Sequence, residues 1–429
     1  MFDIKLLREN PELVRENIKK KFKTDRLKLV DEILEKDRKW RDFKGKVDSL
    51  RADRNKISKQ ISDAKKSGKD TKKLLKEASL IPSKIESLEK KMYSLEEDIS
   101  SLLSKIPNLI HESVAIGKND SENVQMRRIG KPPEFDFQVK NHAEIAESLG
   151  FADFDASAKT SGNGFYYLQG DLALLNQALI RFVLDKLVSK GFDYVETPLM
   201  LRSEVIKKVT DLNDMKNQIY KIDNEDLYLI GTSEHSVIGR FIDTILLEKQ
   251  LPMKFASYSM CFRKEIGSHG IDEKGIFRTH QFNKVEMVVI CKPSDSMNFF
   301  DELQGITVEI FKDLEIPIRI LGICSGDLGD LKHIQVDIEA WSPRTKSYFE
   351  VGSCSNLTDA QARKLKIRVD SKGEKYIPHT LNNTAIATSR ALVAILENYQ
   401  QKDGTVKIPD VLLPYMYGKK FIGKKQSKF

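Results

Sequence analysis

An apolar repeat between residues 74 and 106 limits most strongly what this chain can fold into. Apolar side chains alternate there at spacings of four and three residues, which is typical of a helix packed along its length against another helix. The repeat has ten members: Leu74, Ala78, Ile81, Ile85, Leu88, Met92, Leu95, Ile99, Leu102 and Ile106. A second stripe precedes it and breaks at Arg54: Ile33, Trp40, Phe43, Val47, Leu50, Ile57, Ile61 and Ala64.

The two stripes predict a hairpin of two long helices, a coiled coil over about residues 27–106. The turn signal between them, Ser67-Gly68-Lys69-Asp70, is too short for the helices to pack in parallel, so we expect an antiparallel pair. A helix of about forty residues would be roughly 60 Å long. Pro82 is expected to interrupt and kink the second helix. Ahead of the hairpin, Asn10-Pro11-Glu12 is typical of a helix start.

The net charge of +8 is unevenly distributed along the chain. Residues 1–110 carry 29 basic and 20 acidic side chains, a net of +9, and residues 419–429 carry five lysines and no acid. The remaining residues, 111–418, therefore sum to 8 − 9 − 5 = −6. Within the predicted helical hairpin, which we call the arm, residues 41–76 hold 13 basic and 5 acidic side chains. These features fit a solvated outer face and a grip on nucleic-acid phosphates equally well.

Other features of the composition exclude whole classes of protein. The 429 residues predict two or three domains. The four cysteines form no CxxC pair, which argues against a disulfide framework and a thiolate zinc site and favours a reducing cytosol. No apolar run approaches the 18 residues of a membrane span, and acidic residues throughout the first 30 positions argue against a secretory signal.

The body after the arm alternates helix-like and strand-like segments, which predicts a mixed α and β domain. We expect a linker over 111–136, a folded domain over 137–418 and a Lys-rich tail over 419–429. An amphipathic helix is predicted over 171–190, followed by a strand that closes at Pro198. Two strands, 257–265 and 280–290, flank a charged loop, 267–279, and predict an antiparallel pair. Their period of two places Arg263 with Glu265 on one face, and Phe282, Lys284 and Glu286 on one face.

Three segments of the body carry residues suited to nucleotide chemistry. Arg263 and Arg278 suit phosphate oxygens, and the aromatic face of Phe282 suits a purine. The segment 350–356 offers a carboxylate and hydroxyls for a hard cation, and 382–390 leads into a helix whose start favours an anion. Taken singly, such arginines are more often surface ion pairs. Asp337 and Glu339 are either an acid pair or part of a solvated sheet face.

These segments together resemble the seryl-tRNA synthetases, a family of class II aminoacyl-tRNA synthetases. CFRKEIGSHGIDEKGIFRTHQFNKVEM resembles the second class II motif, and GFDYVETPLM the first, dimer-forming one. GTSEHS resembles the serine-binding loop, and FEVGSCSNLTDAQARKLKIR the ATP-binding segment. LNNTAIATSRALVAILENYQQKDGTVKIPDVL resembles the third motif in its archaeal or eukaryotic form, and the basic hairpin followed by IPNLIHESV resembles the family's N-terminal region. There is no P-loop and no GxGxxG.

The resemblance implies an α+β fold with a class II catalytic domain on an antiparallel sheet flanked by helices. It implies a cytoplasmic homodimer that activates L-serine with ATP and Mg²⁺, without zinc, and transfers it to tRNA(Ser), with tRNA(Sec) as a further acceptor. Alternatives are a paralogue that serves a non-tRNA acceptor and a non-catalytic tRNA-binding relative. The helical hairpin would hold tRNA through these basic residues: Arg41, Lys44, Arg51, Arg54, Lys65, Lys66, Lys72 and Lys73.

The resemblance also implies roles for individual residues. Arg263, Arg390 and Glu350 would be catalytic. ATP would be bound by Arg263, Lys264, Glu265, Arg278, Phe282, Glu350, Val351, Gly352, Ser353 and Arg390. Serine would be bound by Thr232, Ser233, Glu234, Arg263, Glu286 and Thr384. Glu350 and Ser353 would hold the Mg²⁺ that accompanies ATP.

Two positions depart from the family's pattern. Lys332-His333-Ile334-Gln335-Val336 replaces an alanine- and lysine-rich stretch, and Gly352 stands where many members have serine.

Overall fold

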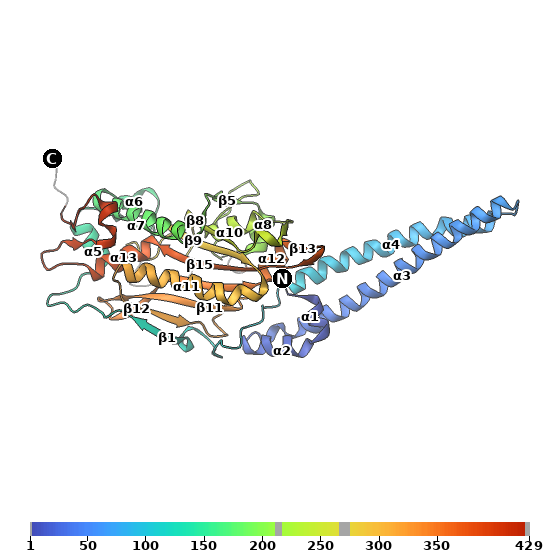
Figure 1. Cartoon of the computed structure of the whole chain (residues 1–429), viewed down its shortest axis with the longest axis horizontal. Helices are drawn as coiled ribbons and strands as arrows, with labels where there is room; N and C mark the ends of the chain where they lie inside the picture. The colour runs from blue at the N-terminus through green and yellow to red at the C-terminus, as the bar shows by residue number, and fades with distance from the viewer. Residues whose placement is uncertain (1, 211–216, 266–274, 425–429) are drawn as a thin grey trace. The chain divides into compact units, whose positions relative to one another are not determined.

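The computed structural model describes residues 2–210, 217–265 and 275–424 of the chain. The predicted loop 267–279 and the Lys-rich tail therefore lie partly outside the described residues. The chain divides into two compact units, residues 1–109 and 110–429 (Figure 1). Among the described residues, no helix is both long and apolar enough to cross a membrane.

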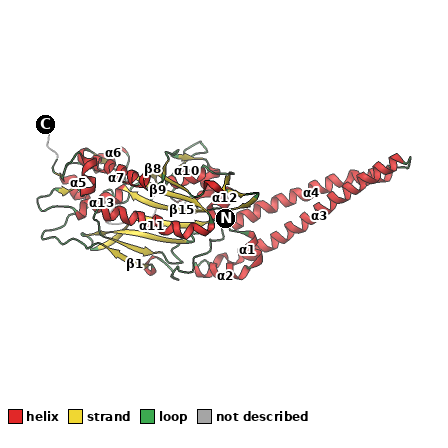
Figure 2. Cartoon of the chain, viewed as in Figure 1, coloured by secondary structure: helices red, strands yellow, loops and turns green. Residues whose placement is uncertain are grey.

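The N-terminal unit is entirely helical. It consists of α1 (Ile4–Glu9), α2 (Pro11–Lys20), α3 (Leu27–Lys66) and α4 (Lys72–Leu103), with a short 3₁₀ turn at Thr24–Arg26 (Figure 2). The predicted helix start is confirmed, because the Asn10 side chain accepts the Leu13 N–H and Pro11 is the first residue of α2.

The long antiparallel hairpin is confirmed by the pairs that join α3 and α4. Lys36 pairs with Asp98, Trp40 with Glu96 and Arg51 with Glu89, so the partner's number falls as the α3 number rises. The apolar stripes meet between the helices, where Val47, Ile81 and Ile85 form a buried cluster. Helix α4 runs through Pro82 without the interruption that the sequence suggested.

A buried charge lies within the α3 stripe. Asp37 is 2% exposed. It accepts hydrogen bonds from Arg8 of α1 and from Arg41, whose Nε lies 3.0 Å from its carboxylate. Because two guanidinium groups satisfy this carboxylate, an acid is tolerated in the apolar seam.

The second unit is built on an eight-stranded sheet in the order β1-β10-β11-β12-β15-β9-β8-β4. Each pairing is antiparallel except that of β4 with β8. The bounds are β1 Val124–Ile129, β4 Asp193–Tyr194, β8 Met253–Phe262, β9 Gln281–Cys291, β10 Ile318–Gly322, β11 Ile334–Ser342, β12 Ser347–Thr358 and β15 His379–Ala387. The antiparallel pair β8–β9 confirms the expected strand hairpin.

Helices and shorter strands complete this unit. The helices are α5 His142–Ser148, α6 Phe154–Thr160, α7 Gly170–Ser189, α8 Ser203–Val209, α10 Ser233–Gly239, α11 Ser296–Asp313, α12 Ala360–Leu365 and α13 Thr388–Asn398. The small strands are β2 Ala152–Asp153, β3 Tyr167–Leu168, β5 Met200–Leu201, β6 Tyr228–Leu229, β7 Ile245–Leu247, β13 Arg368–Ser371, β14 Glu374–Tyr376, β16 Val406–Lys407 and β17 Phe421–Ile422.

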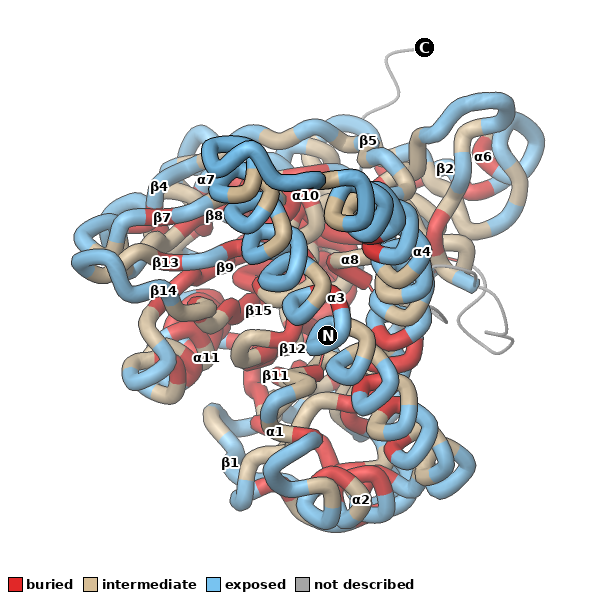
Figure 3. The backbone as a smooth tube through the Cα atoms, turned by 90° about the vertical axis from the view of Figure 1, so that its right-hand side faces the viewer, coloured by how far each residue is buried: buried red, intermediate tan, exposed pale blue. Residues whose placement is uncertain are grey.

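Strand β9 shows how the sheet separates its core from the candidate site. Val285, Met287 and Val289 enter the main hydrophobic cluster, which includes residues of α5, α7, α11 and α13. On the opposite face, Val288 and Ile290 enter a second cluster with residues of α8, α10 and α12. Phe282, Lys284 and Glu286 precede them on that face, as the period of two predicts. Figure 3 shows buried residues concentrated along the central strands.

Two local features differ from the sequence expectations. Strand β1 lies within 111–136, so the segment expected to be a linker contributes an edge strand of the sheet. Strand β8 ends at Phe262, and Glu265 has a φ of +47°. The alternation of faces therefore does not extend to Glu265.

Candidate functional site

A carboxylate and a hydroxyl from neighbouring strands form the first part of the site. Glu286 of β9 and Thr384 of β15 are directly paired, and the Thr384 hydroxyl donates to Glu286 Oε2 over 3.3 Å. Lys284, two residues earlier on β9, forms an ion pair with the same Oε2. Glu286 is 1% exposed and Lys284 5%, so the two charges neutralise each other away from water.

The GTSEHS segment lies beside this pair at the start of α10. Thr232 is the N-cap of α10, and the Glu234 N–H donates to its hydroxyl. Glu234 accepts a hydrogen bond of 2.8 Å from Gln361. Burial raises the pKa of Glu234, and the negative charge of Glu286 raises it further. A second carboxylate therefore lies close enough to Glu286 to interact with it.

Ser233 differs from its neighbours in this segment. Its side chain is fully buried, and its hydroxyl donates to the Ser257 carbonyl of β8 over 3.2 Å. This contact ties α10 to the sheet, so the structure gives Ser233 an architectural contact and does not direct its hydroxyl toward the Glu286–Thr384 pair.

Arginines from three segments form the second part of the site. The Arg263 guanidinium lies over the Phe282 ring, 5.3 Å from its centre, and its Nε donates to the Gly231 carbonyl. Arg278 forms an ion pair of 3.5 Å with Glu265. Lys264 instead lies over the Tyr220 ring, 5.9 Å from its centre.

Arg390, in the first turn of α13, is fixed at two atoms. Its Nε donates to the Phe277 carbonyl over 2.8 Å, and its Nη1 donates to the Glu350 carbonyl over 2.7 Å. Its guanidinium also lies 4.2 Å from the centre of the Phe277 ring. Burial lowers its pKa, Glu350 and Glu265 oppose that shift, and Arg278 and Arg263 add to it. The three arginines are therefore within electrostatic reach of one another.

The acids of β11 and β12 form the third part. Asp337 lies directly across from Ser353, and Glu339 across from Glu350. Burial, followed by the charge of Glu350, raises the pKa of Asp337 to about 7. Glu339 forms an ion pair with Arg319. The acid pair suggested by the sequence is therefore better described as Asp337 with Glu350.

The two residues between Glu350 and Ser353 face away from this group. Val351 is 2% exposed and belongs to the main hydrophobic cluster. A Cβ added at Gly352 would lie 3.1 Å from the Thr384 carbonyl. At both positions only the backbone could contact a nucleotide. A side chain at position 352 would come too close to the backbone of β15.

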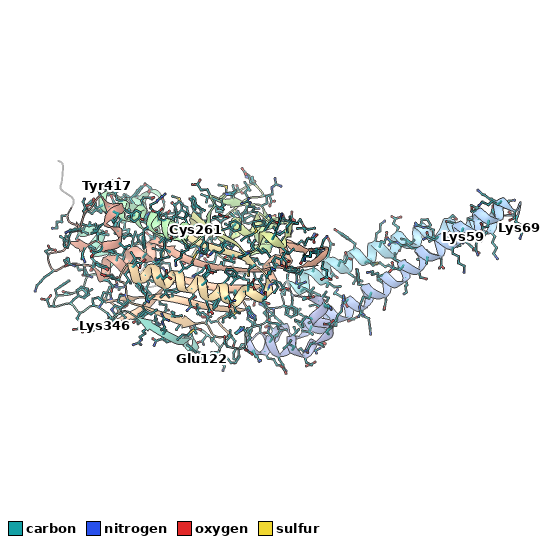
Figure 4. All side chains as sticks on the ribbon, in the orientation of Figure 1. Lys59, Lys69, Glu122, Cys261, Lys346 and Tyr417 are labelled. Atoms are coloured by element: carbon teal, nitrogen blue, oxygen red, sulfur yellow. The ribbon has the colours of Figure 1, made fainter. Side chains whose placement is uncertain are left out.

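The eight basic residues predicted to hold tRNA are exposed on α3 and α4. Arg41 pairs with Asp37, Arg51 pairs with Glu89 and Lys44 lies over the Trp40 ring. The remaining five are Arg54, Lys65, Lys66, Lys72 and Lys73. Figure 4 labels two further lysines of this region, Lys59 and Lys69, in the half of the hairpin that contains the turn.

Sequence reasoning did not assign Lys284 or Gln361 to the site, and it raised Asp337 only as one half of an acid pair with Glu339. Lys284 was visible only as a neighbour of Glu286 at a spacing of two. Gln361 is 1% exposed and donates a hydrogen bond to Glu234, which lies 127 positions earlier in the chain. No local sequence pattern predicts that contact.

Comparisons with known proteins match both units. The seryl-tRNA synthetase N-terminal domain matches residues 1–110, and the class II tRNA synthetase core domain (G, H, P, S and T) matches residues 218–399. A serine–tRNA ligase of Methanoregula boonei is 46% identical over 98% of this chain and 100% of its own length.

Two solved structures are also similar. Seryl-tRNA synthetase from Pyrococcus horikoshii, complexed with ATP, has a TM-score of 0.94 and 43% identity, covering 99% of this chain and 100% of that one. Cytoplasmic serine–tRNA ligase from Naegleria fowleri, in complex with AMP, has a TM-score of 0.90 and 34% identity, covering 99% of each chain.

Proposed function

The chain belongs to the seryl-tRNA synthetase family, and from this premise we propose how its own residues carry serine to tRNA. It is an ATP-dependent ligase that joins serine to tRNA. The reaction has two steps. Serine first reacts with ATP to give seryl-adenylate and pyrophosphate, and a terminal ribose hydroxyl of tRNA then takes the seryl group and releases AMP.

The Glu286–Thr384 pair is the observation on which the serine site rests. A buried carboxylate suits the serine ammonium, and a hydroxyl one strand away suits the serine hydroxyl. In this structure the Glu286 carboxylate forms an ion pair with Lys284. The serine ammonium therefore has to share that carboxylate with Lys284 or displace the lysine. Thr232 and Glu234 border the same place, and the Gln361 bond holds the Glu234 carboxylate in position.

The first step needs charge cancellation more than proton transfer. The serine carboxylate is already ionised near neutral pH and attacks the α-phosphorus of ATP directly. Catalysis then depends on in-line placement and on cationic groups that match the charge of the transition state. We assign Arg263 to the α-phosphate, Arg278 and Arg390 to the γ-phosphate, and Phe282 to the adenine ring. Lys264, Glu265 and the backbone at 351–352 complete the ATP contacts.

A magnesium ion fits the acids of β11 and β12. Carboxylate and hydroxyl oxygens are the ligands that Mg²⁺ prefers. Burial raises the pKa of Asp337 and the charge of Glu350 raises it further, and the buried Ser353 hydroxyl belongs to the residue directly across the strand pair from Asp337. We therefore propose Glu350, Ser353 and Asp337 as the residues that hold Mg²⁺. The ion would supply positive charge to the phosphates of ATP.

The helical hairpin is proposed as the tRNA handle. Its exposed lysines and arginines suit backbone phosphates, which fix position without reading sequence. A cytoplasmic location is proposed as well, supported by the four cysteines, which are buried and free.

The chain is also proposed to form a homodimer through the face that carries the first class II motif. Tyr194 is 40% exposed and Met200 44%, so two large side chains of that motif meet solvent in the single chain. A surface pocket of about 770 Å³ is lined by residues that include Tyr167, Leu174 and Met260. Light scattering after gel filtration measures this directly, and a monomer at micromolar concentration would refute it.

ATP–pyrophosphate exchange with serine, threonine, alanine and glycine tests the amino-acid assignment. Exchange that depends on serine, followed by charging of tRNA, is expected. Absence of exchange with serine would sink the serine assignment. Exchange without transfer to tRNA would favour a non-tRNA acceptor.

A further inference from the structure

A buried polar cluster lies in the catalytic unit, apart from the residues assigned above. His142 of α5 is 2% exposed and Glu397 of α13 is 1% exposed. The His142 Nδ1 lies 3.6 Å from Glu397 Oε1, and the Arg344 Nε lies 3.5 Å from the same oxygen. The Ser342 hydroxyl donates to the other carboxylate oxygen, Oε2. Burying a carboxylate costs free energy unless partners compensate it. The side chains around Glu397 are those partners.

The other nitrogen of His142 reaches the chain just before Arg278. The Ile276 N–H donates to His142 Nε2 over 3.3 Å. An imidazole nitrogen that accepts a hydrogen bond carries no proton, so neutral His142 carries its proton on Nδ1, the atom that faces Glu397. In this tautomer the Nδ1 proton faces the Glu397 carboxylate, 3.6 Å away, and Nε2 accepts from Ile276.

Helix α13 fixes two consecutive residues of this segment, Ile276 and Phe277. Arg390 and Glu397 are seven positions apart, which is two helical turns, so they lie on the same side of α13. Arg390 binds the Phe277 carbonyl directly, and Glu397 acts on the Ile276 N–H through His142. The Phe277 ring is further packed edge-on against Phe349, 5.3 Å between ring centres.

Gly275 shows how closely His142 approaches this backbone. Its φ is +126°, and a Cβ built there would lie 2.2 Å from His142 Nε2. No side chain fits between the imidazole and residue 275 unless the contact with Ile276 opens.

We propose that His142 and Glu397 are positioning residues for ATP. They fix residues 275–277 and so set where the next residue, Arg278, presents its guanidinium. This inference rests on the proposed role of Arg278 at the γ-phosphate. Neither His142 nor Glu397 touches the nucleotide, and neither contributes to the serine site around Glu286.

The test separates ATP binding from serine binding and from stability. His142→Leu removes the acceptor for Ile276 while keeping an apolar volume, and His142→Gln can restore an acceptor. Ile145→Ala is a matched control, because Ile145 is a buried residue of the same helix that enters the hydrophobic cluster. ATP affinity is measured by calorimetry, the serine KM by pyrophosphate exchange at saturating ATP, and stability by thermal unfolding.

We expect His142→Leu to bind ATP roughly tenfold more weakly, with the serine KM unchanged. His142→Gln should recover most of that loss, and Ile145→Ala should lower the unfolding temperature without changing ATP affinity. Glu397→Gln, which keeps the volume and removes the charge, should weaken ATP binding in the same direction, and it carries the test if His142→Leu does not fold.

Unchanged ATP affinity in both His142→Leu and Glu397→Gln would overturn the proposal. So would an equal loss of ATP affinity in Ile145→Ala. A wild-type chain that binds ATP but shows no serine-dependent exchange would instead refute the proposed serine activity, and the calorimetric comparison would still judge the positioning pair.

Discussion

The Thr384 hydroxyl donates to Glu286 across directly paired positions of β15 and β9. The sheet register therefore fixes the spacing between a hydroxyl and a carboxylate. Serine carries a hydroxyl and an ammonium group at a similarly short separation, which makes this pair the natural place to test substrate choice.

Thr384→Val should reduce the preference for serine over alanine. The substitution keeps the shape of the side chain and removes the hydroxyl that would be left unpaired by alanine. We expect the ratio of exchange rates for serine and alanine to fall by about tenfold or more. Thr384→Ser is the matched control and should keep the preference. An unchanged ratio in Thr384→Val would exclude Thr384 from selection.

Glu286→Gln should abolish serine activation and also destabilise the fold. Removing one partner of a buried ion pair leaves Lys284 unpaired, at a cost of about 3–5 kcal/mol. Adding Lys284→Met should restore much of the free energy of unfolding without restoring exchange. Denaturant titration and pyrophosphate exchange measure the two effects. If the double variant regained exchange, Glu286 would not be the ammonium ligand.

Asp337→Asn should raise the Mg²⁺ concentration needed for half-maximal exchange. It removes the carboxylate whose pKa is raised first by burial and then by the charge of Glu350. Glu339→Gln is the control, because Glu339 lies on the same strand but is paired with Arg319. An identical Mg²⁺ dependence in Asp337→Asn and the wild type would place the cation elsewhere.

Replacing Lys65, Lys66, Lys72 and Lys73 by glutamine should weaken tRNA binding and make it less sensitive to salt. Each phosphate contact that is lost reduces the slope of log affinity against log salt by about one. Lys90 and Lys91, replaced in the same way, are a control from the half of α4 away from the turn. Exchange with serine should be unaffected in both variants. Equal losses of tRNA affinity in the two variants would show that the tip has no special role.

The sequence predicted the hairpin well because its apolar spacing is local. Ten positions in one helix specify a seam, and the short turn forces an antiparallel partner. Asp37 escaped notice because its partner Arg8 lies in another helix. The alternation along β9 was equally reliable, since period two is a property of any strand.

The sequence indicated residue types suited to the proposed site, and it indicated less of how those residues contact one another. Glu265 was placed with Arg263 by strand period, but β8 ends at Phe262 and Glu265 has a positive φ, so the period does not reach it. Gln361 and His142 make contacts between distant segments, and such contacts leave no spacing in the sequence. The family resemblance named the residues that we propose to contact substrate more readily than the residues that position them.

The two units also differ in how far along the chain their contacts reach. The hairpin closes between neighbouring helices, whereas the site joins residues 232, 286, 337 and 384 across the sheet. Structures built on short-range contacts form early and rapidly, and those built on long-range pairings form late. On the ribosome, the arm should therefore be complete while the sheet still lacks β15. We expect a nascent chain to acquire its handle for RNA well before it can activate an amino acid.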